Sequence, residues 1–330
     1  MSQAAFDVVG IGNAIVDVIA HADDAFLVTH GLNKGAMTLI DAHRAEDLYA
    51  KMGPGIEMSG GSAGNTMAGI ASLGGKGAYI GKVRDDQLGT VFRHDIRAVG
   101  VQFDSPPATE GPPTARCLIL VTPDAQRTMN TYLGACVELG PDDIDADLIR
   151  GAQVTYLEGY LWDKALAREA FLKAAALAHE GGRKLSLTLS DSFCVGRHRA
   201  EFSDLVDNHV DILFANEHEI LSLYQVDRFE DALAAVRGRS EIAVLTRSEK
   251  GSVVVTADAV HEVPADPIDR VIDTTGAGDL FAAGFLYGYT QGRSLPDCAR
   301  IAGIAAAEVI SHIGARPEVA LADLVSRKLG

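Results

Sequence analysis

The sequence has few of the residues that build disulfide frameworks, zinc ribbons or nucleic-acid-binding surfaces. Its four cysteines are far apart and form no CxxC pair, which argues against the first two. They are Cys117, Cys136, Cys194 and Cys298. The ten histidines form no HExxH motif. The formal net charge is −16 and no run of Lys or Arg offsets it, so the chain's field repels nucleic acid and anionic membranes.

An early basic segment and long apolar runs are also missing. The first basic residue is Lys34, so we expect no secretory signal. The apolar stretch over residues 6–20 is interrupted by Asp7, Asn13 and Asp17, which makes it unfit to span a bilayer. We therefore expect a cytoplasmic protein with no membrane partner and no nucleic-acid partner.

Apolar residues and glycine are abundant. The 330 residues are 47% hydrophobic and 22% charged, which excludes a disordered or collagen-like chain, and they include 34 glycines. Short apolar, β-branched segments alternate with longer helical patterns, which predicts a mainly parallel sheet covered by helices on both faces. The expected strands are 6–11, 78–83, 154–157, 184–189, 212–215 and 242–246. The expected helices are 64–73, 87–98, 164–179 and 217–224.

Two regions, residues 14–40 and 101–133, break this alternation. They have the pattern of strands and turns without long helices, and Pro106-Pro107 and Gly111-Pro112-Pro113 punctuate the second. We infer a main α/β domain and a small β-rich lid made from two insertions. The main domain would comprise 1–12, 42–100 and 135–330, and the lid 13–41 and 101–134.

Nucleotide-binding motifs of other enzyme classes are absent or weak. Residues 10–15 contain a Gly-x-Gly after a strand, but Ile15 replaces the third glycine of a dinucleotide fingerprint and another strand-like run follows. A Walker A motif is missing, because neither Gly75-Lys76 nor Gly81-Lys82 has a glycine five positions before it.

The segment Gly60-Gly61-Ser62-Ala63-Gly64-Asn65 opens a predicted helix. Its glycines let a ligand approach the backbone, and the helix start offers unpaired N–H groups. A loop with Ser62 as N-cap is an equally good interpretation. Asn65 favours a binding role, since an amide just inside a helix otherwise gains little.

The segment from Asp273 to Asp279 is a second glycine-rich helix start, and the helix after it is apolar nearly all round. Asp279 could simply satisfy the helix dipole. However, Gly276-Ala277-Gly278 bares consecutive N–H groups beside the carboxylate, and such a nest binds anions. A base beside an anion cradle suits phosphoryl transfer to an alcohol.

In this order and separation, the two motifs resemble the ribokinase-like (PfkB) carbohydrate kinase family. Residues 273–284, Asp-Thr-Thr-Gly-Ala-Gly-Asp-Leu-Phe-Ala-Ala-Gly, fill that family's C-terminal signature at every position. The resemblance extends over essentially the whole chain. It implies an ATP-dependent kinase with a Rossmann-like three-layer core, a mainly parallel sheet and a small β-sheet lid.

The resemblance also assigns catalytic roles. Asp279 would be the general base, and the N–H groups of Gly276, Ala277 and Gly278 the anion hole. Arg127 would close over the phosphate from the lid, although it could equally be a solvated charge.

On the nucleotide side, the resemblance implies contacts from Thr246, Gly251 and His312. Asn216 and Glu219 match an Asn-x-x-Glu motif linked to Mg²⁺ and phosphate, and they could also form a capping box. Monovalent cations, K⁺ in particular, bind in this family near the positions of Asp273 and Thr275.

On the acceptor side, the resemblance implies a set of substrate-binding residues. They are Asn13, Asp17, Gly61, Asn65, Cys117 and Tyr160. Residues 187–193, 113–117 and 156–160 look most like the adenosine kinase branch. Glu158 and Asp191 depart from that branch, and a carboxylate near the base could accept a hydrogen bond from a guanine N–H.

We therefore expect phosphorylation of a nucleoside 5′-hydroxyl with ATP and Mg²⁺, most often of adenosine and also of guanosine or other nucleosides. Two alternatives stay open at this point: a kinase for a free sugar such as ribose or fructose, and a non-catalytic nucleoside or nucleotide sensor. The chain would be a monomer or a homodimer formed through the lid.

Overall fold

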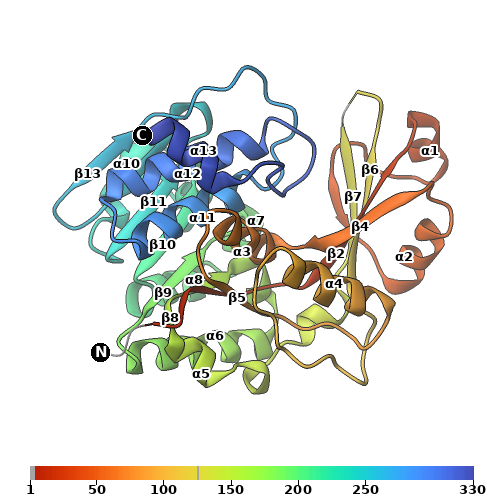
Figure 1. The fold of residues 1–330 in the computed structure, drawn as a ribbon, viewed down its shortest axis with the longest axis horizontal. Helices are drawn as coiled ribbons and strands as arrows, with labels where there is room; N and C mark the ends of the chain where they lie inside the picture. Colours follow the sequence, from red (N-terminus) through yellow and green to blue (C-terminus); the bar gives the residue numbers. More distant parts are fainter. Residues whose placement is uncertain (1–3, 125) are drawn as a thin grey trace.

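The computed structural model describes residues 4–124 and 126–330, which form an α/β core and a smaller sheet beside it (Figure 1). The core sheet comprises β1 (Phe6–Ile11), β5 (Gly77–Ile80), β8 (Ala152–Glu158), β9 (Lys184–Thr188), β10 (Ile212–Asn216), β11 (Ile242–Thr246), β12 (Ser252–Val255) and β13 (Val260–Val263). Its strand order is β13-β12-β11-β10-β9-β8-β1-β5. The six neighbouring strands β11, β10, β9, β8, β1 and β5 are parallel. At the other edge, β12 pairs antiparallel with β11, and β13 pairs antiparallel with β12.

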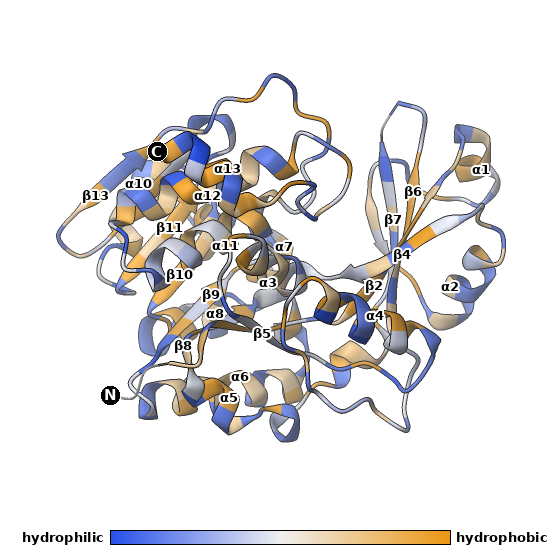
Figure 2. Ribbon diagram, viewed as in Figure 1, coloured by the Kyte–Doolittle hydropathy of each residue, from blue (hydrophilic) through white to orange (hydrophobic). Residues whose placement is uncertain are grey.

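Helices cover both faces of the core sheet, which confirms the predicted three-layer α/β fold. One face packs against α5 (Ala146–Gly151), α6 (Ala165–Glu180), α8 (Arg199–Asn208), α9 (Glu217–Tyr224) and α10 (Phe229–Val236). The other packs against α3 (Ser62–Ser72), α4 (Gln87–Ala98), α11 (Ala277–Thr290) and α12 (Leu295–Val309). In Figure 2 the core strands are mostly orange, whereas outer helices such as α5 and α6 mix blue and orange. This pattern fits strands buried on both faces and amphipathic helices.

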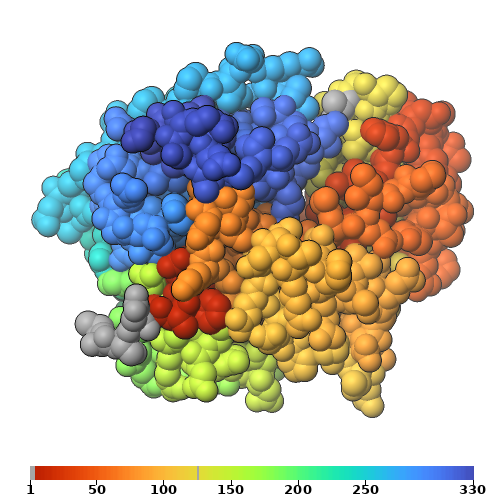
Figure 3. All heavy atoms as spheres, in the orientation of Figure 1, coloured from red at the N-terminus to blue at the C-terminus, as the bar shows by residue number. Residues whose placement is uncertain are grey.

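Residues from both expected insertions build the smaller sheet, the lid. It contains β2 (Ile15–His21), β3 (Met37–Leu39), β4 (Gly55–Gly60), β6 (Ala115–Val121) and β7 (Arg127–Tyr132), in the order β3-β7-β6-β2-β4. Two short helices, α1 (Asp24–Thr29) and α2 (Ala42–Tyr49), accompany it. Figure 3 shows the two insertions that contribute to the lid, coloured red and yellow, gathered on the right of the molecule.

The structure departs from the expected boundaries of core and lid in two places. Residues 42–60, predicted as core, contribute α2 and β4 to the lid, since β4 pairs antiparallel with β2. Its sequence, Gly-Ile-Glu-Met-Ser-Gly, has no clear alternation that could have marked it as a strand. Conversely, Val101 and Phe103, predicted as lid, are buried in the core.

The remaining helices are shorter or lie at the end of the chain. They are α7 (Ser192–Arg197), α13 (Leu321–Leu329) and the 3-10 turns η1 (Gly134–Glu138), η2 (Pro141–Asp143), η3 (Gly159–Asp163) and η4 (Ser248–Lys250). No helix in the described part of the chain is both long and apolar enough to cross a membrane.

Glycines allow α3, α11 and α12 to pack closely. A Cβ on Gly69 of α3 would lie 2.6 Å from the Ala283 Cβ of α11. A Cβ on Gly284 of α11 would lie 2.6 Å from the Ala302 Cα of α12. Real Cβ atoms do not approach this closely, so the helix spacing depends on these positions being glycine.

We predict that Gly284→Ala destabilises the protein by about 1–3 kcal/mol, because the added methyl group overpacks the α11–α12 contact. This loss exceeds the gain of about 1 kcal/mol that alanine brings to a helix interior. Gly303→Ala in α12 is the matched control, since its Cβ would have no neighbour closer than 3.8 Å. Urea titration should show Gly303→Ala unchanged or stabilised; a stabilised Gly284→Ala would contradict the packing argument.

Candidate active site

The carboxyl ends of the parallel strands open into a cavity of about 700 Å³ between core and lid. Residues at or just beyond the ends of β1, β8, β9, β10 and β11 line it, in that order Asn13, Glu158, Thr188, Asn216 and Thr246. Open α/β sheets bind ligands at this edge, where the strands end and helices begin.

Asp279 lies in the first turn of α11 and faces the first turn of α3. Its Oδ1 accepts a hydrogen bond from the Ser62 hydroxyl at 2.7 Å, and its Oδ2 accepts one from Asn65 Nδ2 at 3.0 Å. Burial raises the pKa of Asp279, while these two donors and the charge of Arg316 act in the opposite direction. The result is an oriented carboxylate of increased basicity, as a general base requires.

Ser62 has a role that its position as a candidate N-cap did not predict. The N-cap of α3 is Gly61, with φ of 84°, and Ser62 is the first helical residue. The Ser62 hydroxyl is therefore free to bind Asp279 instead of a backbone N–H. Because Ser62 and Asn65 are three residues apart in a helix, they share one face, and this spacing could have indicated a common partner.

The start of α11 has the geometry of an anion cradle. Gly276 has φ of 79°, and a Cβ there would lie 2.8 Å from the Ala315 Cα, so only glycine fits. The first N–H groups of a helix have no acceptor within the helix. However, the Ala277 N–H donates to the Thr274 carbonyl at 3.3 Å, so one of the three expected donors is engaged in the loop.

Asp17 of β2 and Gly60 of β4 meet at the lid side of the cavity. A Cβ on Gly60 would collide with the Asp17 carboxylate, so glycine makes room for the acid. Burial raises the pKa of Asp17 to about 6, against the lowering effect of Arg127 and Arg316. A carboxylate in this position can accept hydrogen bonds from hydroxyl groups of a ligand.

Asn13 lines the cavity, but its amide is held within the wall. Asn13 Nδ2 donates to Glu158 Oε1 at 2.5 Å, and Asn13 Oδ1 accepts from the Cys136 thiol at 3.0 Å. Glu158 also accepts from the Ala63 N–H at 2.9 Å. Both oxygens of Glu158 thus have partners in the protein, and its interpretation as a carboxylate that receives a base N–H stays a prediction.

Arg127 of β7 forms an ion pair with Asp273, and the two side chains are only 6% and 7% exposed. The interpretation of Arg127 as a solvated charge is therefore wrong. The Asp273 carboxylate also accepts from the Gly314 N–H and from the N–H and hydroxyl of Thr275. Its oxygens are thus occupied by protein donors, which leaves the expected K⁺ site without a free carboxylate oxygen.

Asn216 and Glu219 form the capping box of α9, in which each side chain accepts a hydrogen bond from the other residue's backbone N–H. Burial raises the pKa of Glu219 to about 7. The described residues contain no group of three or more His, Cys, Asp or Glu that could hold a metal. Direct ligation by Glu219 would break the cap, so the pair fits a hydrated Mg²⁺ that keeps its waters.

Most of the expected site residues line the cavity. These are Asn13, Asp17, Gly61, Asn65, Cys117, Tyr160, Asn216, Glu219, Thr246, Thr275, Gly276, Ala277, Gly278 and Asp279. Burial raises the pKa of Cys117 to about 12, so its thiol is not an anionic ligand.

The other expected site residues, Arg127, Asp273, Gly251 and His312, are not part of the lining. Gly251 has φ of 88°, and a Cβ there would collide with the Val263 carbonyl, which assigns it to a tight turn. The His312 ring lies 3.3 Å from Glu308 and 3.7 Å from Glu318, and its contact with the nucleotide stays a prediction.

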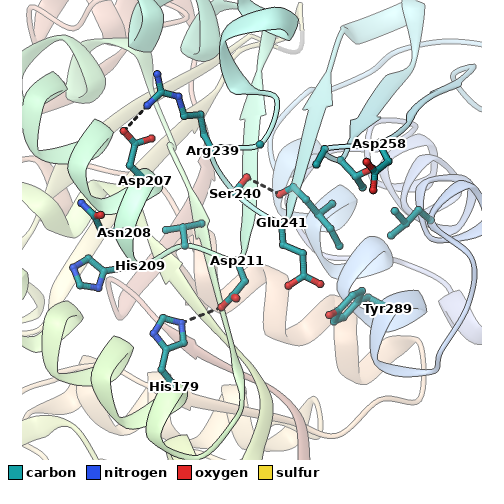
Figure 4. A pocket seen from close by; sticks show the side chains of 16 residues that line it. His179, Asp207, Asn208, His209, Asp211, Arg239, Ser240, Glu241, Asp258 and Tyr289 are labelled. Atoms are coloured by element: carbon teal, nitrogen blue, oxygen red, sulfur yellow. Dashed lines mark hydrogen bonds and ion pairs between the residues drawn. The ribbon is translucent and has the colours of Figure 1, made fainter.

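A second cavity of about 730 Å³ opens at the amino ends of β10 and β11 (Figure 4). Four of its polar side chains are paired with one another, His179 with Asp211 and Arg239 with Asp207. It contains none of the motif residues. The chemistry of the chain therefore lies at the carboxyl ends of the strands.

Comparison with known proteins agrees with this geometry. Residues 39–320 match the model of the pfkB family of carbohydrate kinases. The chain belongs to this family. It is therefore a phosphotransferase, a nucleoside or sugar kinase, and the family implies ATP as phosphoryl donor.

Two solved structures from rhizobia are similar over nearly the whole chain. A probable sugar kinase protein from Rhizobium etli is 56% identical, with a TM-score of 0.91, and the match covers 98% of this chain and 99% of that one. Adenosine kinase from Sinorhizobium meliloti is 55% identical, with a TM-score of 0.91, over 99% and 100% of the two chains. Adenosine kinase from Saccharomyces cerevisiae is 26% identical over 92% of this chain and 94% of its own length. The two adenosine kinases support the adenosine kinase-like branch.

We predict that Asp279→Asn lowers kcat by about 10²- to 10⁴-fold, the usual contribution of a general base. The amide has nearly the same shape but cannot take the proton of the acceptor. Nucleotide binding, measured by calorimetry, should be unchanged. Turnover equal to that of the wild type would exclude Asp279 as the base.

We predict that Ser62→Ala shifts the acidic limb of the kcat/KM profile to higher pH, by about one unit. A hydrogen bond to a charged group is worth about 1.5–3 kcal/mol, and one pKa unit corresponds to about 1.4 kcal/mol. Loss of this donor raises the pKa of Asp279, so the base becomes protonated at a higher pH. Ser326→Ala, at an exposed position of α13, is the control and should leave the profile unmoved.

Proposed function

We propose that the protein transfers the γ-phosphoryl group of ATP to the 5′-hydroxyl of a nucleoside, with adenosine as the preferred acceptor. The observation that carries this proposal is the two-sided character of the cavity. One end holds carboxylates and the helix starts of α3 and α11, and the lid contributes mostly apolar side chains besides Asp17 and Thr131.

The lid contributes a continuous set of apolar side chains to the cavity. They are Ile15, Met37, Leu39, Ile119, Met129 and Leu133. Met37 and Leu39 are 49% and 60% exposed, so a ligand could remove substantial apolar surface from water. A purine base would cover this wall, whereas a free sugar is polar on every side.

Two exposed aromatic side chains lie at the core side of the same cavity. Phe193 is 78% exposed and Tyr160 is 42% exposed, and both belong to the lining. Flat aromatic rings with free faces suit stacking with a heterocycle. They favour a nucleoside over ribose or fructose.

In the proposed reaction, Asp279 takes the proton of the 5′-hydroxyl as its oxygen attacks the γ-phosphorus of ATP. The bond between the γ-phosphorus and the bridging oxygen breaks, and ADP leaves with that electron pair. Ser62 and Asn65 hold Asp279 in orientation throughout, since each binds one of its oxygens. Asp279 returns its proton to solvent after product release.

The accumulating negative charge is met by fixed positive groups. The free N–H groups at the start of α11 point at the transferring phosphoryl group. Arg127 would add a charge from the lid by leaving Asp273 for the phosphate. When bound with ATP, Mg²⁺ neutralises phosphate oxygens, and Asn216 and Glu219 would hold its waters.

A free-sugar kinase is the second candidate. Asp17 and the α3 start could hold a sugar as well as a ribosyl group, and the Rhizobium etli relative is described as a probable sugar kinase. The apolar wall and the two exposed aromatic rings would then have no ligand to cover them.

The cytoplasmic location and a monomer or lid-mediated homodimer stay predictions.

We predict that adenosine has the highest kcat/KM in a panel of adenosine, guanosine, inosine, ribose and fructose. An assay that couples ADP release to NADH oxidation measures all five with the same enzyme. Ribose or fructose turnover above that of every nucleoside would overturn the proposal and support the sugar kinase.

A substitution in the lid tests whether the apolar wall binds the base of the nucleoside. Leu39→Ser should raise KM for the nucleoside, because the base reaches the wall. If the enzyme also phosphorylates ribose, KM for ribose should be unchanged, because ribose has no base. Val28→Ser is the matched control, since Val28 is 81% exposed in α1 and does not line the cavity. An equal effect of the two variants would contradict the assignment of the wall to a base.

A further inference from the structure

Glu158 is a buried carboxylate in the cavity wall whose partners are all hydrogen-bond donors. It is the last residue of β8 and is 1% exposed. It accepts from Asn13 N–H at 3.3 Å, Asn13 Nδ2 at 2.5 Å and Ala63 N–H at 2.9 Å. A buried carboxylate is costly unless such donors satisfy it, so its presence requires a reason.

Two glycines in the surrounding backbone make room for this arrangement. A Cβ on Gly12 would collide with Glu158 Oε2, and a Cβ on Gly61 would collide with the Asn13 carbonyl. The turn after β1, the start of α3 and the end of β8 therefore converge on one carboxylate. Since Ala63 is in the first turn of α3, the negative charge also lies at the favourable end of the helix dipole.

The first turn of α3 is consequently held from two sides. Glu158 binds its backbone through Ala63 N–H. Asp279 binds its side chains through Ser62 and Asn65. Any shift of the helix start relative to Glu158 moves the two donors that orient the base.

We propose that Glu158 is a positioning residue for the acceptor: it fixes Asn13 and the start of α3, and through them the ribosyl site and the orientation of Asp279. The proposal rests on the proposed acceptor site, but not on which nucleoside or sugar occupies it. The residue must be a carboxylate because three donors converge on it, whereas a Gln side chain would turn its own NH₂ toward a donor.

Titratable groups from several elements face Glu158. They are Tyr79 of β5, Cys136 of η1, Tyr156 of β8, Tyr160 of η3 and Asp279 of α11. Burial raises the pKa of each of the tyrosines and of Cys136, so these groups stay neutral near pH 7. Burial also raises the pKa of Glu158 to about 7, against the effect of its donors. As the pH falls through this value, Glu158 gains a proton and loses an acceptor position for Asn13 or Ala63.

The test compares Glu158→Gln with the wild type, using whichever acceptor the wild type phosphorylates best. We expect KM for the acceptor to rise about tenfold, the equivalent of about 1.4 kcal/mol, with KM for ATP unchanged. In the wild type, KM for the acceptor should rise as the pH falls from about 8.5 to 7, whereas in Glu158→Gln it should be high and flat over this range, which lies above the titration of Asp17. A residue with only a structural role would not remove this pH dependence.

Glu262→Gln is the matched control, because Glu262 is exposed on β13 and far from the cavity lining. It should behave as the wild type. If Glu158→Gln does not fold, as judged by circular dichroism and thermal melting, Glu158→Asp replaces it, since the shorter acid cannot reach Asn13 and Ala63 together. An acceptor KM with wild-type magnitude and pH dependence, or an equal rise in both KM values, would overturn the proposal. If kcat/KM is highest for a sugar in the acceptor panel, adenosine is refuted as the preferred acceptor. The comparison of Glu158→Gln with the wild type can still be made with that sugar.

Discussion

The active site depends on one contact, the pair of hydrogen bonds from the α3 start to the Asp279 carboxylate. Asn65 and Asp279 are 214 positions apart in the chain, so the fold must bring two helix starts together to make it. Gly69 permits the close approach of α3 and α11, and Gly276 permits the turn against Ala315 that begins α11. These glycines determine the distance between the two helices. That distance decides whether Ser62 and Asn65 can orient the Asp279 carboxylate.

Electrostatics explains how such an acidic protein binds ATP. The net charge of −16 opposes polyanions only at the surface. Inside the cavity, helix-start N–H groups provide a local positive potential that does not depend on the overall charge. Arg127 lies outside the lining and would add to this potential on leaving Asp273. The same cavity carries buried acids, Asp17 and Glu158, whose pKa values burial raises to about 6 and about 7. Acceptor binding is therefore expected to be sensitive to pH near neutrality.

The fold class, the six predicted strands and the four predicted helices are all present in the structure. They could be predicted because buried parallel strands and amphipathic helices have strong periodic patterns. It also located Asp279 and the α11 start, since a glycine-rich helix start is a local feature. Contacts between distant segments could not be predicted. The ion pair of Arg127 with Asp273, the hydrogen bond from Ala63 to Glu158 and the pairing of β4 with β2 each join residues that no local pattern connects.

The most direct test of the account is to identify the phosphorylated product by ³¹P NMR after incubation with adenosine, ATP and Mg²⁺. The account predicts one new phosphomonoester signal, split by the two protons of the 5′ carbon, together with an equal amount of ADP. A signal split by a single proton would place the phosphate on the 2′ or 3′ oxygen. That result, or ADP with inorganic phosphate alone, would contradict transfer to the 5′-hydroxyl by Asp279.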